Sequence, residues 1–223
     1  MSVPHALWAS MLPADTVFTP DQVAVAASGN RIRFADGSDR LCATSGLWNV
    51  PLGFGAPAIA EAVDRATRDA SYLSLFRGPH RYAEIAAEAL IELAGPSRYS
   101  RVIFSTSGGA ANDAAMKLTR QYWSQRGIGS RSLIVGLKGS YHGTMYGSHA
   151  LSGDDLLQSV YSVDRRSVRH VSHSDDGEEL EVLLRREGSR VAAVVVEPVL
   201  GSGAHPLSDA FIARLLALRD EHG

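Results

Sequence analysis

Three short segments of the sequence combine residue types that could bind a planar, anionic ligand. The first is Ser107-Gly108-Gly109, a turn of small residues placed before a helical segment. The start of a helix carries unpaired backbone N–H groups and a partial positive charge, and glycine lets a phosphate approach the backbone closely. The turn therefore favours an anion site, with a purely structural turn as the alternative. Its spacing matches neither the dinucleotide fingerprint nor the P-loop.

The second segment is Gly139-Ser140-Tyr141-His142-Gly143, and the third is an apolar run that ends in Glu197-Pro198. An aromatic ring beside a small-residue turn can lie flat against a planar ligand. The alternative for Tyr141 is a loop aromatic that covers the core. A carboxylate at the end of a buried strand needs a hydrogen-bond donor or a cationic partner, so a structural ion pair or helix cap is the alternative for Glu197.

Strand and helix patterns alternate from residue 101 onward, and this alternation positions the three segments. Apolar, β-rich runs predict strands at 102–105, 133–136 and 191–197, and apolar periodicity predicts helices at 111–125, 178–186 and 208–222. Strands buried on both faces and separated by helices predict an α/β fold, with a mostly parallel sheet and flanking helices. Ligands on such sheets bind at the carboxyl ends of the strands, where all three segments fall.

The part of the chain before residue 101 has a different pattern. Short strands separated by turn residues are expected at 23–27, 31–34 and 41–43, a small antiparallel meander, and helices are expected at 6–11, 57–70 and 80–94. We therefore expect residues 1–56 to form an N-terminal arm with small antiparallel strands. Residues 57–223 are expected to be the first part of a large α/β domain.

Composition excludes several classes of protein. The net charge of −2 gives no basic excess for nucleic acid, and no apolar run approaches the roughly 20 residues that span a bilayer. The N-terminus lacks a charged region followed by an apolar core, so no signal peptide is expected. Cys42 is the one cysteine, which excludes an internal disulfide and fits a reducing, cytoplasmic location. We expect Cys42 to be a buried small hydrophobe in a strand rather than a reactive thiol.

Other residues with chemical potential are expected to be structural. His170 and His173 lack nearby cysteines or a third ligand, so surface histidines are favoured over a metal site. Lys117 is expected to be solvated or ion-paired on its helix. Ser107 has no Gly-x-Ser-x-Gly context and no paired base, which argues against a serine hydrolase.

Taken together, the segments resemble the class III (omega) aminotransferases, enzymes of fold type I that depend on pyridoxal 5′-phosphate (PLP). Residues 107–120 are similar to the family's Ser-Gly-Ser/Thr-Glu-Ala-Asn…Ala-x-Lys-x-Ala-Arg segment, and residues 139–144 are similar to its aromatic-His-Gly segment. Residues 192–198 resemble its strand ending in Glu-Pro, and residues 45–55 its Gly-x-Trp…Leu-Gly substrate-side segment. The resemblance extends in the right order from about residue 22 to the end.

The resemblance implies how the phosphate of PLP is held. Gly108 and Gly109 would give backbone N–H groups to the phosphate, and Ser107 would shape the turn. Two departures stand here, because Gly109 replaces a Ser/Thr hydroxyl and Ala110 replaces the usual Glu. One phosphate hydrogen bond of roughly 1.5–3 kcal/mol is therefore expected to be lost, which weakens cofactor affinity without abolishing it.

The resemblance also implies roles around the pyridine ring. Tyr141 would stack on the ring, His142 would support it, and Glu197 would lie below the cofactor on the substrate side. Trp48 would form a wall of the substrate pocket. Where the family often has Gln-Gly-Glu after Glu-Pro, this chain has Leu200-Gly201-Ser202, so no carboxylate is available there to gate a substrate arginine. This departure argues against the family's common use of 2-oxoglutarate.

The family's Schiff-base lysine, and the Asp that pairs with the pyridine nitrogen, have no counterpart up to Gly223. The resemblance therefore implies an amino-group transfer between an amine donor and an oxo acid, with no catalytic residue in this chain and no activity expected of it alone. We expect the N-terminal portion of a longer enzyme, a subunit completed by a C-terminal chain, or a degenerate partner, in that order. A homodimer is also expected. The alternatives are a non-catalytic scaffold subunit of the same fold and another fold-type-I activity such as an aminomutase.

Overall fold

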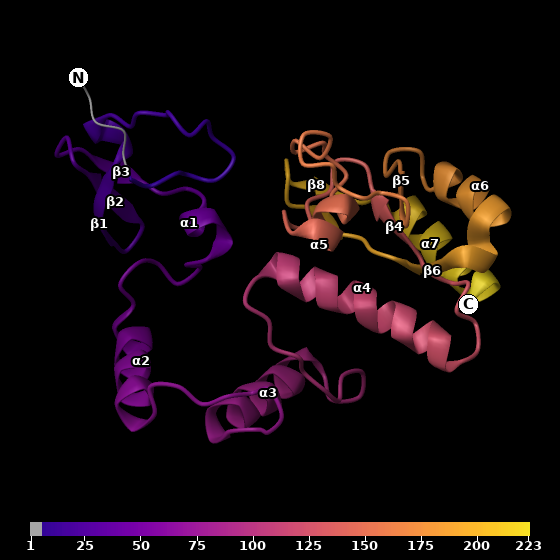
Figure 1. The fold of residues 1–223 in the computed structure, drawn as a ribbon, viewed down its shortest axis with the longest axis horizontal. Helices are drawn as coiled ribbons and strands as arrows, with labels where there is room; N and C mark the ends of the chain where they lie inside the picture. Colours follow the sequence, from indigo (N-terminus) through magenta and orange to yellow (C-terminus); the bar gives the residue numbers. More distant parts are fainter. Residues whose placement is uncertain (1–5) are drawn as a thin grey trace. The chain divides into compact units, whose positions relative to one another are not determined.

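The computed structural model describes residues 6–223, and the chain divides into two compact units, Met1–Ser100 and Arg101–Gly223. Each unit contains β-sheet of its own (Figure 1). The predicted boundary between residues 56 and 57 concerns the domains of a complete enzyme and stays a prediction.

The first unit contains the predicted antiparallel meander. Strands β1 (Ala24–Ser28), β2 (Arg31–Phe34) and β3 (Asp39–Leu41) pair in this order, after a short 3-10 helix, Pro20–Gln22. A four-residue turn of helix, α1 (Ser45–Trp48), was not predicted, whereas α2 (Pro57–Asp69) and α3 (Arg81–Ala94) confirm the two predicted helices. Helix α2 begins with proline, whose missing N–H costs nothing in a first turn, and His80 caps α3 through the Ala83 amide.

The second unit is built on a parallel sheet, which confirms the predicted α/β class. Strand β4 (Leu133–Leu137) lies between β5 (Val168–Val171) and β6 (Val191–Val194) and is parallel to both. The helices are α4 (Gly108–Gln125), α5 (Tyr146–Leu151), α6 (Glu178–Glu187) and α7 (Asp209–His222) (Figure 1). A 3-10 turn (Gly188–Arg190) and the two-stranded hairpin of β7 (Val199–Leu200) and β8 (His205–Pro206) complete the unit.

Alternate residues of β4 face two separate clusters, so the unit has three layers. Leu133, Val135 and Leu137 pack with apolar residues of α6 and α7, among them Leu180 and Phe211. On the other face the core is smaller and includes Met116 of α4, Ile134 of β4 and Leu151 of α5. The sheet is therefore covered by helices on both faces, which explains why β4 reads as a continuous apolar run.

Several predictions for individual segments were wrong. Residues 102–105 form no strand, because a β-rich run becomes a strand only beside a neighbour that pairs with it, and none occurs for them among residues 6–223. Residues 6–11 form turns and irregular backbone rather than a helix. Cys42 is half-buried just after β3 rather than buried within it. The Gly46 amide donates to its sulfur, which lowers the pKa of the thiol.

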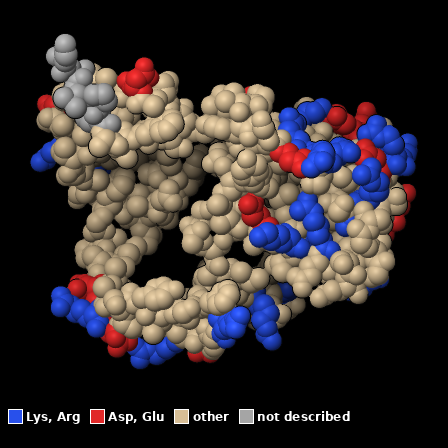
Figure 2. All heavy atoms as spheres, viewed as in Figure 1, with Lys and Arg blue, Asp and Glu red and all other residues tan. Residues whose placement is uncertain are grey.

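The surface of the second unit carries charges of both signs. Figure 2 shows acidic and basic side chains next to each other over the region that α6 forms. Three of the ion pairs there are Lys138–Glu179, Arg169–Glu187 and Arg185–Glu181. Within residues 6–223, no helix combines the length and the apolar character needed to cross a bilayer.

Candidate active site

The start of α4 presents the predicted anion turn. Helix α4 begins at Gly108 rather than at residue 111, because Ser107 is its N-cap: the Ser107 hydroxyl accepts from the Ala110 amide at 3.1 Å, and the Ser107 carbonyl accepts from the Ala111 amide at 2.9 Å. Gly108 and Gly109 therefore occupy the first turn, whose amides have no acceptor within the helix. Ser107 and Gly108 are exposed and Gly109 is half-buried, so the turn is open to a ligand.

Close contact between two glycines joins this turn to the predicted aromatic segment. A Cβ on Gly143 would lie 2.6 Å from Gly109 Cα and 3.3 Å from Gly109 N, and Gly143 has a φ of +122°. A Cβ on Gly109 would lie 3.6 Å from Gly143 Cα. Only glycine at 143 combines this backbone conformation with this approach. The backbone at Gly143, the last residue of this segment, is thus held against the first turn of α4.

Polar side chains fix His142 at the end of this segment. The His142 amide donates to the Ser152 hydroxyl at 2.9 Å, and its carbonyl accepts from the Asn112 side chain at 2.7 Å. The imidazole is 6% exposed, and its Nε2 atom is buried without a hydrogen-bond partner. Burial lowers the pKa of His142, and nearby His170 lowers it further, while the Glu197 carboxylate partly offsets both effects. Burial therefore favours the neutral form of the ring.

Tyr141 and Glu197 lie next to each other, as the strand order predicts. Glu197 Oε2 accepts from the Tyr141 amide at 3.2 Å, and Glu197 Oε1 accepts from the Gly201 amide at 3.4 Å. The partners of this carboxylate are therefore backbone amides, which excludes a lysine or arginine ion pair as the reason for its position. Tyr141 is 46% exposed, so it is not part of the buried core.

Trp48 belongs to the first unit, and its substrate role stays a prediction. Its side chain is 71% exposed. The backbone of α1 has positive φ angles throughout, with +54° at Leu47 and +63° at Trp48. Strained backbone of this kind costs about 1–3 kcal/mol per residue and persists where the surroundings or a function require it. The sequence gives no indication of this conformation.

The expectation of surface histidines was wrong, because His170 and His173 are both half-buried. His170 lies on β5, with its Nε2 2.9 Å from the Leu151 carbonyl oxygen. Across residues 6–223, no group of three or more His, Cys, Asp or Glu side chains is arranged to hold a metal ion. Lys117 is exposed on α4, and Lys138 pairs with Glu179 at 2.8 Å.

Sequence reasoning missed four residues that position the site. Asn112 and Ser152 hold His142, and Asp113 Oδ1 accepts from the Ser148 amide at 2.5 Å at the start of α5. The adjacent pair Asn112-Asp113 in the otherwise small-residue start of α4 was a usable indication. Ser148 and Ser152 lie in α5 and at its end, and α5 is too short to show apolar periodicity.

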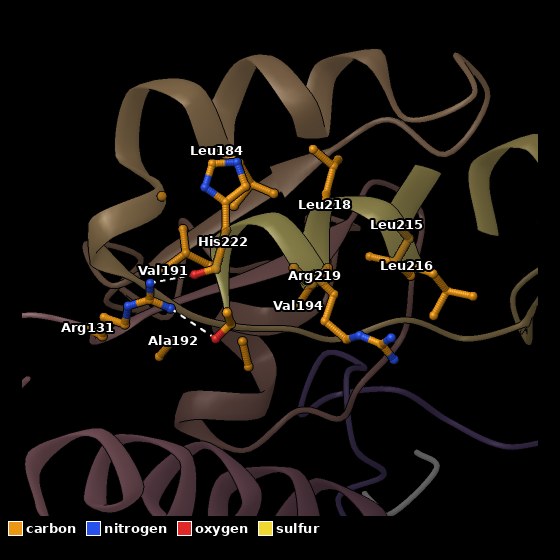
Figure 3. Close-up of a pocket in the computed structure, with 13 residues that line it drawn as sticks. Arg131, Leu184, Val191, Ala192, Val194, Leu215, Leu216, Leu218, Arg219 and His222 are labelled. Carbon is orange, nitrogen blue, oxygen red and sulfur yellow. Dashed lines mark hydrogen bonds between the residues drawn. The ribbon is translucent and has the colours of Figure 1, made fainter. Parts of the chain in front are cut away.

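One mostly apolar cavity lies away from these residues. Its volume is about 260 Å³, and apolar residues of β6 and α7 line most of it (Figure 3). Arg131 closes one end by donating to the carbonyl oxygens of His222, at 2.6 Å, and Gly223, at 3.2 Å (Figure 3). None of the predicted site residues lines this cavity, and it has few polar groups that could orient a ligand.

The chain is similar in sequence and in structure to known aminotransferases. The omega-aminotransferase of Caulobacter vibrioides is 28% identical, with 97% of this chain and 54% of that protein covered. The putrescine–pyruvate aminotransferase of Pseudomonas aeruginosa is 27% identical over 79% of this chain and 42% of that protein. The PLP-bound structure of an amine transaminase from an uncultivated Pseudomonas species matches with a TM-score of 0.89 at 24% identity, covering 99% of this chain and 55% of that one.

These matches show two things. The chain spans about half the length of the curated relatives it matches, and its fold is that of the fold-type-I transaminases. The family model for class-III aminotransferases matches residues 15–223, which include all three candidate segments and Trp48. The chain therefore belongs to the class-III aminotransferase family.

Proposed function

We propose that this chain is the part of a PLP-dependent aminotransferase that holds the phosphate and ring of the cofactor. The transfer would take place between an amine donor and an oxo acid. The observation that carries the proposal is the contact between Gly109 and Gly143, because it holds an anion-binding helix start against a segment that presents Tyr141. Family membership gives the same activity independently.

The residues at the start of α4 fit a phosphate ester. The first-turn amides at Gly108 and Gly109 point out of the helix toward its N-terminal side, where the helix dipole favours negative charge. Ser107 uses its hydroxyl as the cap and so leaves these two amides to a ligand. Gly108 has no atom within 4 Å of the position that a Cβ would occupy, so nothing crowds the approach.

The residues around Tyr141 fit a flat ring. The tyrosine ring is half-exposed, while its backbone is held by Glu197, so the ring is positioned for stacking before a ligand arrives. His142 brings a buried imidazole with an unpartnered Nε2 next to it. Glu197 is proposed to lie on the substrate side, and Trp48 to form a wall of the substrate pocket. Bound PLP would supply the electron sink for amino transfer.

A second polypeptide segment is needed for this chemistry. The family's lysine would come from a continuation of the chain past Gly223 or from a complementing C-terminal chain, and a homodimer is the proposed assembly. Two features support such partners: β6 has no strand on its outer side within the described residues, and Ile59 and Val63 on α2 are more than half exposed. A cytoplasmic location is proposed from the single free cysteine.

Borohydride trapping tests the proposal. The chain is incubated with PLP, reduced with borohydride, digested and mapped by mass spectrometry. Because Lys117 and Lys138 are its two lysines and neither lies in the site, the chain alone should bind PLP reversibly and give no specific adduct. Addition of a chain that carries the C-terminal half should give an adduct on a lysine of that half, together with transaminase activity.

The same experiment distinguishes the non-catalytic alternatives. A scaffold subunit would join the second chain without generating an adduct that depends on both chains. Failure of the chain to bind PLP in either setting would refute the proposed cofactor site. An adduct without amino transfer would favour another fold-type-I activity, such as an aminomutase.

A further inference from the structure

A buried hydroxyl group without a partner lies beside the start of α4. Ser148, in α5, is 0% exposed, and its Oγ atom makes no hydrogen bond. Its backbone is fully engaged, since its amide donates to Asp113 and its carbonyl accepts from Ser152. An unpaired buried hydroxyl is costly, and in a native structure it calls for an explanation such as a ligand.

The Ser148 hydroxyl lies next to the anion turn at the start of α4. Ser148 Oγ lies 3.2 Å from the point that a Cβ on Gly109 would occupy, and 3.0 Å from the corresponding point on Gly143. It therefore faces the contact between the two glycines, at the second residue of α4. Helix α5 packs on α4 near this start (Figure 1).

Because Gly109 has no Cβ, no side chain of its own stands between the first turn of α4 and Ser148 Oγ. The resemblance places a Ser or Thr side chain at this position in the family, whereas here the volume of that side chain is left to other atoms. An anion held by the first-turn amides can place an oxygen next to this position. That oxygen would then lie within hydrogen-bond reach of Ser148 Oγ, for which O–H···O distances are about 2.5–3.0 Å.

We propose that Ser148 is a phosphate ligand, and that its hydroxyl replaces the Ser/Thr hydroxyl that the family carries at position 109. The hydroxyl would donate to the phosphate ester of the cofactor, beside the first-turn amides of α4. This inference rests on the proposed function, because it assigns a further ligand to the same site.

The test compares a phosphorylated ligand with its unphosphorylated counterpart. Equilibrium dialysis measures the affinity of the chain for pyridoxamine 5′-phosphate and for pyridoxamine, neither of which forms an imine with lysine. Ser148→Ala should lower the affinity for pyridoxamine 5′-phosphate by about tenfold or more and leave pyridoxamine unchanged, because a hydrogen bond to a charged group is lost. Adding Gly109→Ser to Ser148→Ala should restore most of the loss.

Ser140→Ala is the matched control. Ser140 is also 0% exposed, but its hydroxyl donates to the Leu137 carbonyl at 2.7 Å, so it is not available to a ligand. Its removal should leave the preference for the phosphorylated ligand unchanged. Ser148→Thr, which keeps a hydroxyl, should also retain the preference. If Ser148→Ala does not fold, Ser148→Cys keeps the size with a weak donor and should show the loss.

The outcomes separate the two proposals. A wild-type chain that binds both ligands equally would refute the phosphate site, and with it the role of Ser148. A wild-type chain that prefers the phosphorylated ligand, with the same preference in Ser148→Ala or Ser148→Cys, would refute the role of Ser148 alone. An equal loss for both ligands in Ser148→Ala would show a structural role, and would overturn the inference as well.

Discussion

Gly143→Ala tests the contact that joins the two halves of the proposed cofactor site. The new methyl group would lie 2.6 Å from Gly109 Cα and 3.0 Å from Ser148 Oγ, in a residue with a φ of +122°. A non-glycine residue in such a conformation costs about 1–3 kcal/mol, and overpacking against backbone atoms adds about 1–3 kcal/mol. We expect the free energy of unfolding of the second unit to fall by about 2–6 kcal/mol.

Gly127→Ala is the matched control for backbone strain. Gly127 also has a positive φ, +76°, but no atom lies within 4 Å of its Cβ position. This variant should show the conformational cost alone. Gly108→Ala, with open space and no positive φ, should change the free energy of unfolding by less than about 0.5 kcal/mol.

The assay is urea unfolding followed by the fluorescence of Trp123, which lies in the second unit. Trp8 and Trp48 are replaced by Phe in all variants so that the signal reports this unit. Dialysis with pyridoxamine 5′-phosphate is measured on the same proteins. If Gly143→Ala destabilises the unit no more than Gly127→Ala, the two segments are not in contact, and the structural basis of the proposed site fails.

Three further predictions concern the ring and its supports. Tyr141→Ala should weaken binding of pyridoxamine and of its phosphate by the same factor, about 2–12-fold, because stacking contributes about 0.5–1.5 kcal/mol; Tyr141→Phe should bind normally, and a loss confined to the phosphate form would contradict the stacking role. Glu197→Ala removes the acceptor of the Tyr141 and Gly201 amides and should destabilise the second unit by about 1–3 kcal/mol in urea unfolding. Glu197→Gln keeps an acceptor oxygen and should cost less. Equal stability of the wild type and both variants would refute the role of Glu197 in holding these two amides. Burial lowers the pKa of His142 and His170 below the ordinary 6.5, so just below pH 6.5 the unfolded chain binds more protons than the folded chain. The free energy of unfolding should therefore fall as the pH decreases through this range, by up to about 1.4 kcal/mol per pH unit for each histidine. Replacing both histidines by Asn should flatten this pH profile.

Several strands and helices of the second unit were predictable because their residues favour the same secondary structure that their apolar pattern indicates. Strand β4 and helices α6 and α7 were predicted to within one residue at most ends. Strand β5 was missed, since Arg169 and His170 interrupt its apolar pattern: Arg169 is ion-paired with Glu187, and His170 bonds to the Leu151 carbonyl. The strand predicted at residues 102–105 was wrong for the opposite reason, because an apolar run does not form a strand without a neighbouring strand to pair with.

The candidate site was predictable where backbone chemistry decides it. A glycine turn before a helix and a carboxylate after a strand can be recognised from the local sequence alone. The structure brings the glycine turn close to Gly143 and the Glu197 carboxylate close to the Tyr141 amide. The supporting residues were not predictable, because their partners are distant in sequence. Asn112 bonds to a carbonyl 30 residues away, and no local pattern encodes such a contact.

The order of the parallel sheet has a consequence for synthesis on the ribosome. Both neighbours of β4 follow it in the chain: Val168–Val171 begins about 30 residues after Leu137, and Val191–Val194 begins later still. At typical elongation rates of about 5–20 residues per second, the most apolar strand of the unit waits for seconds with both edges unsatisfied. Nascent β4 is therefore open to chaperone binding until β5 and β6 have been synthesised.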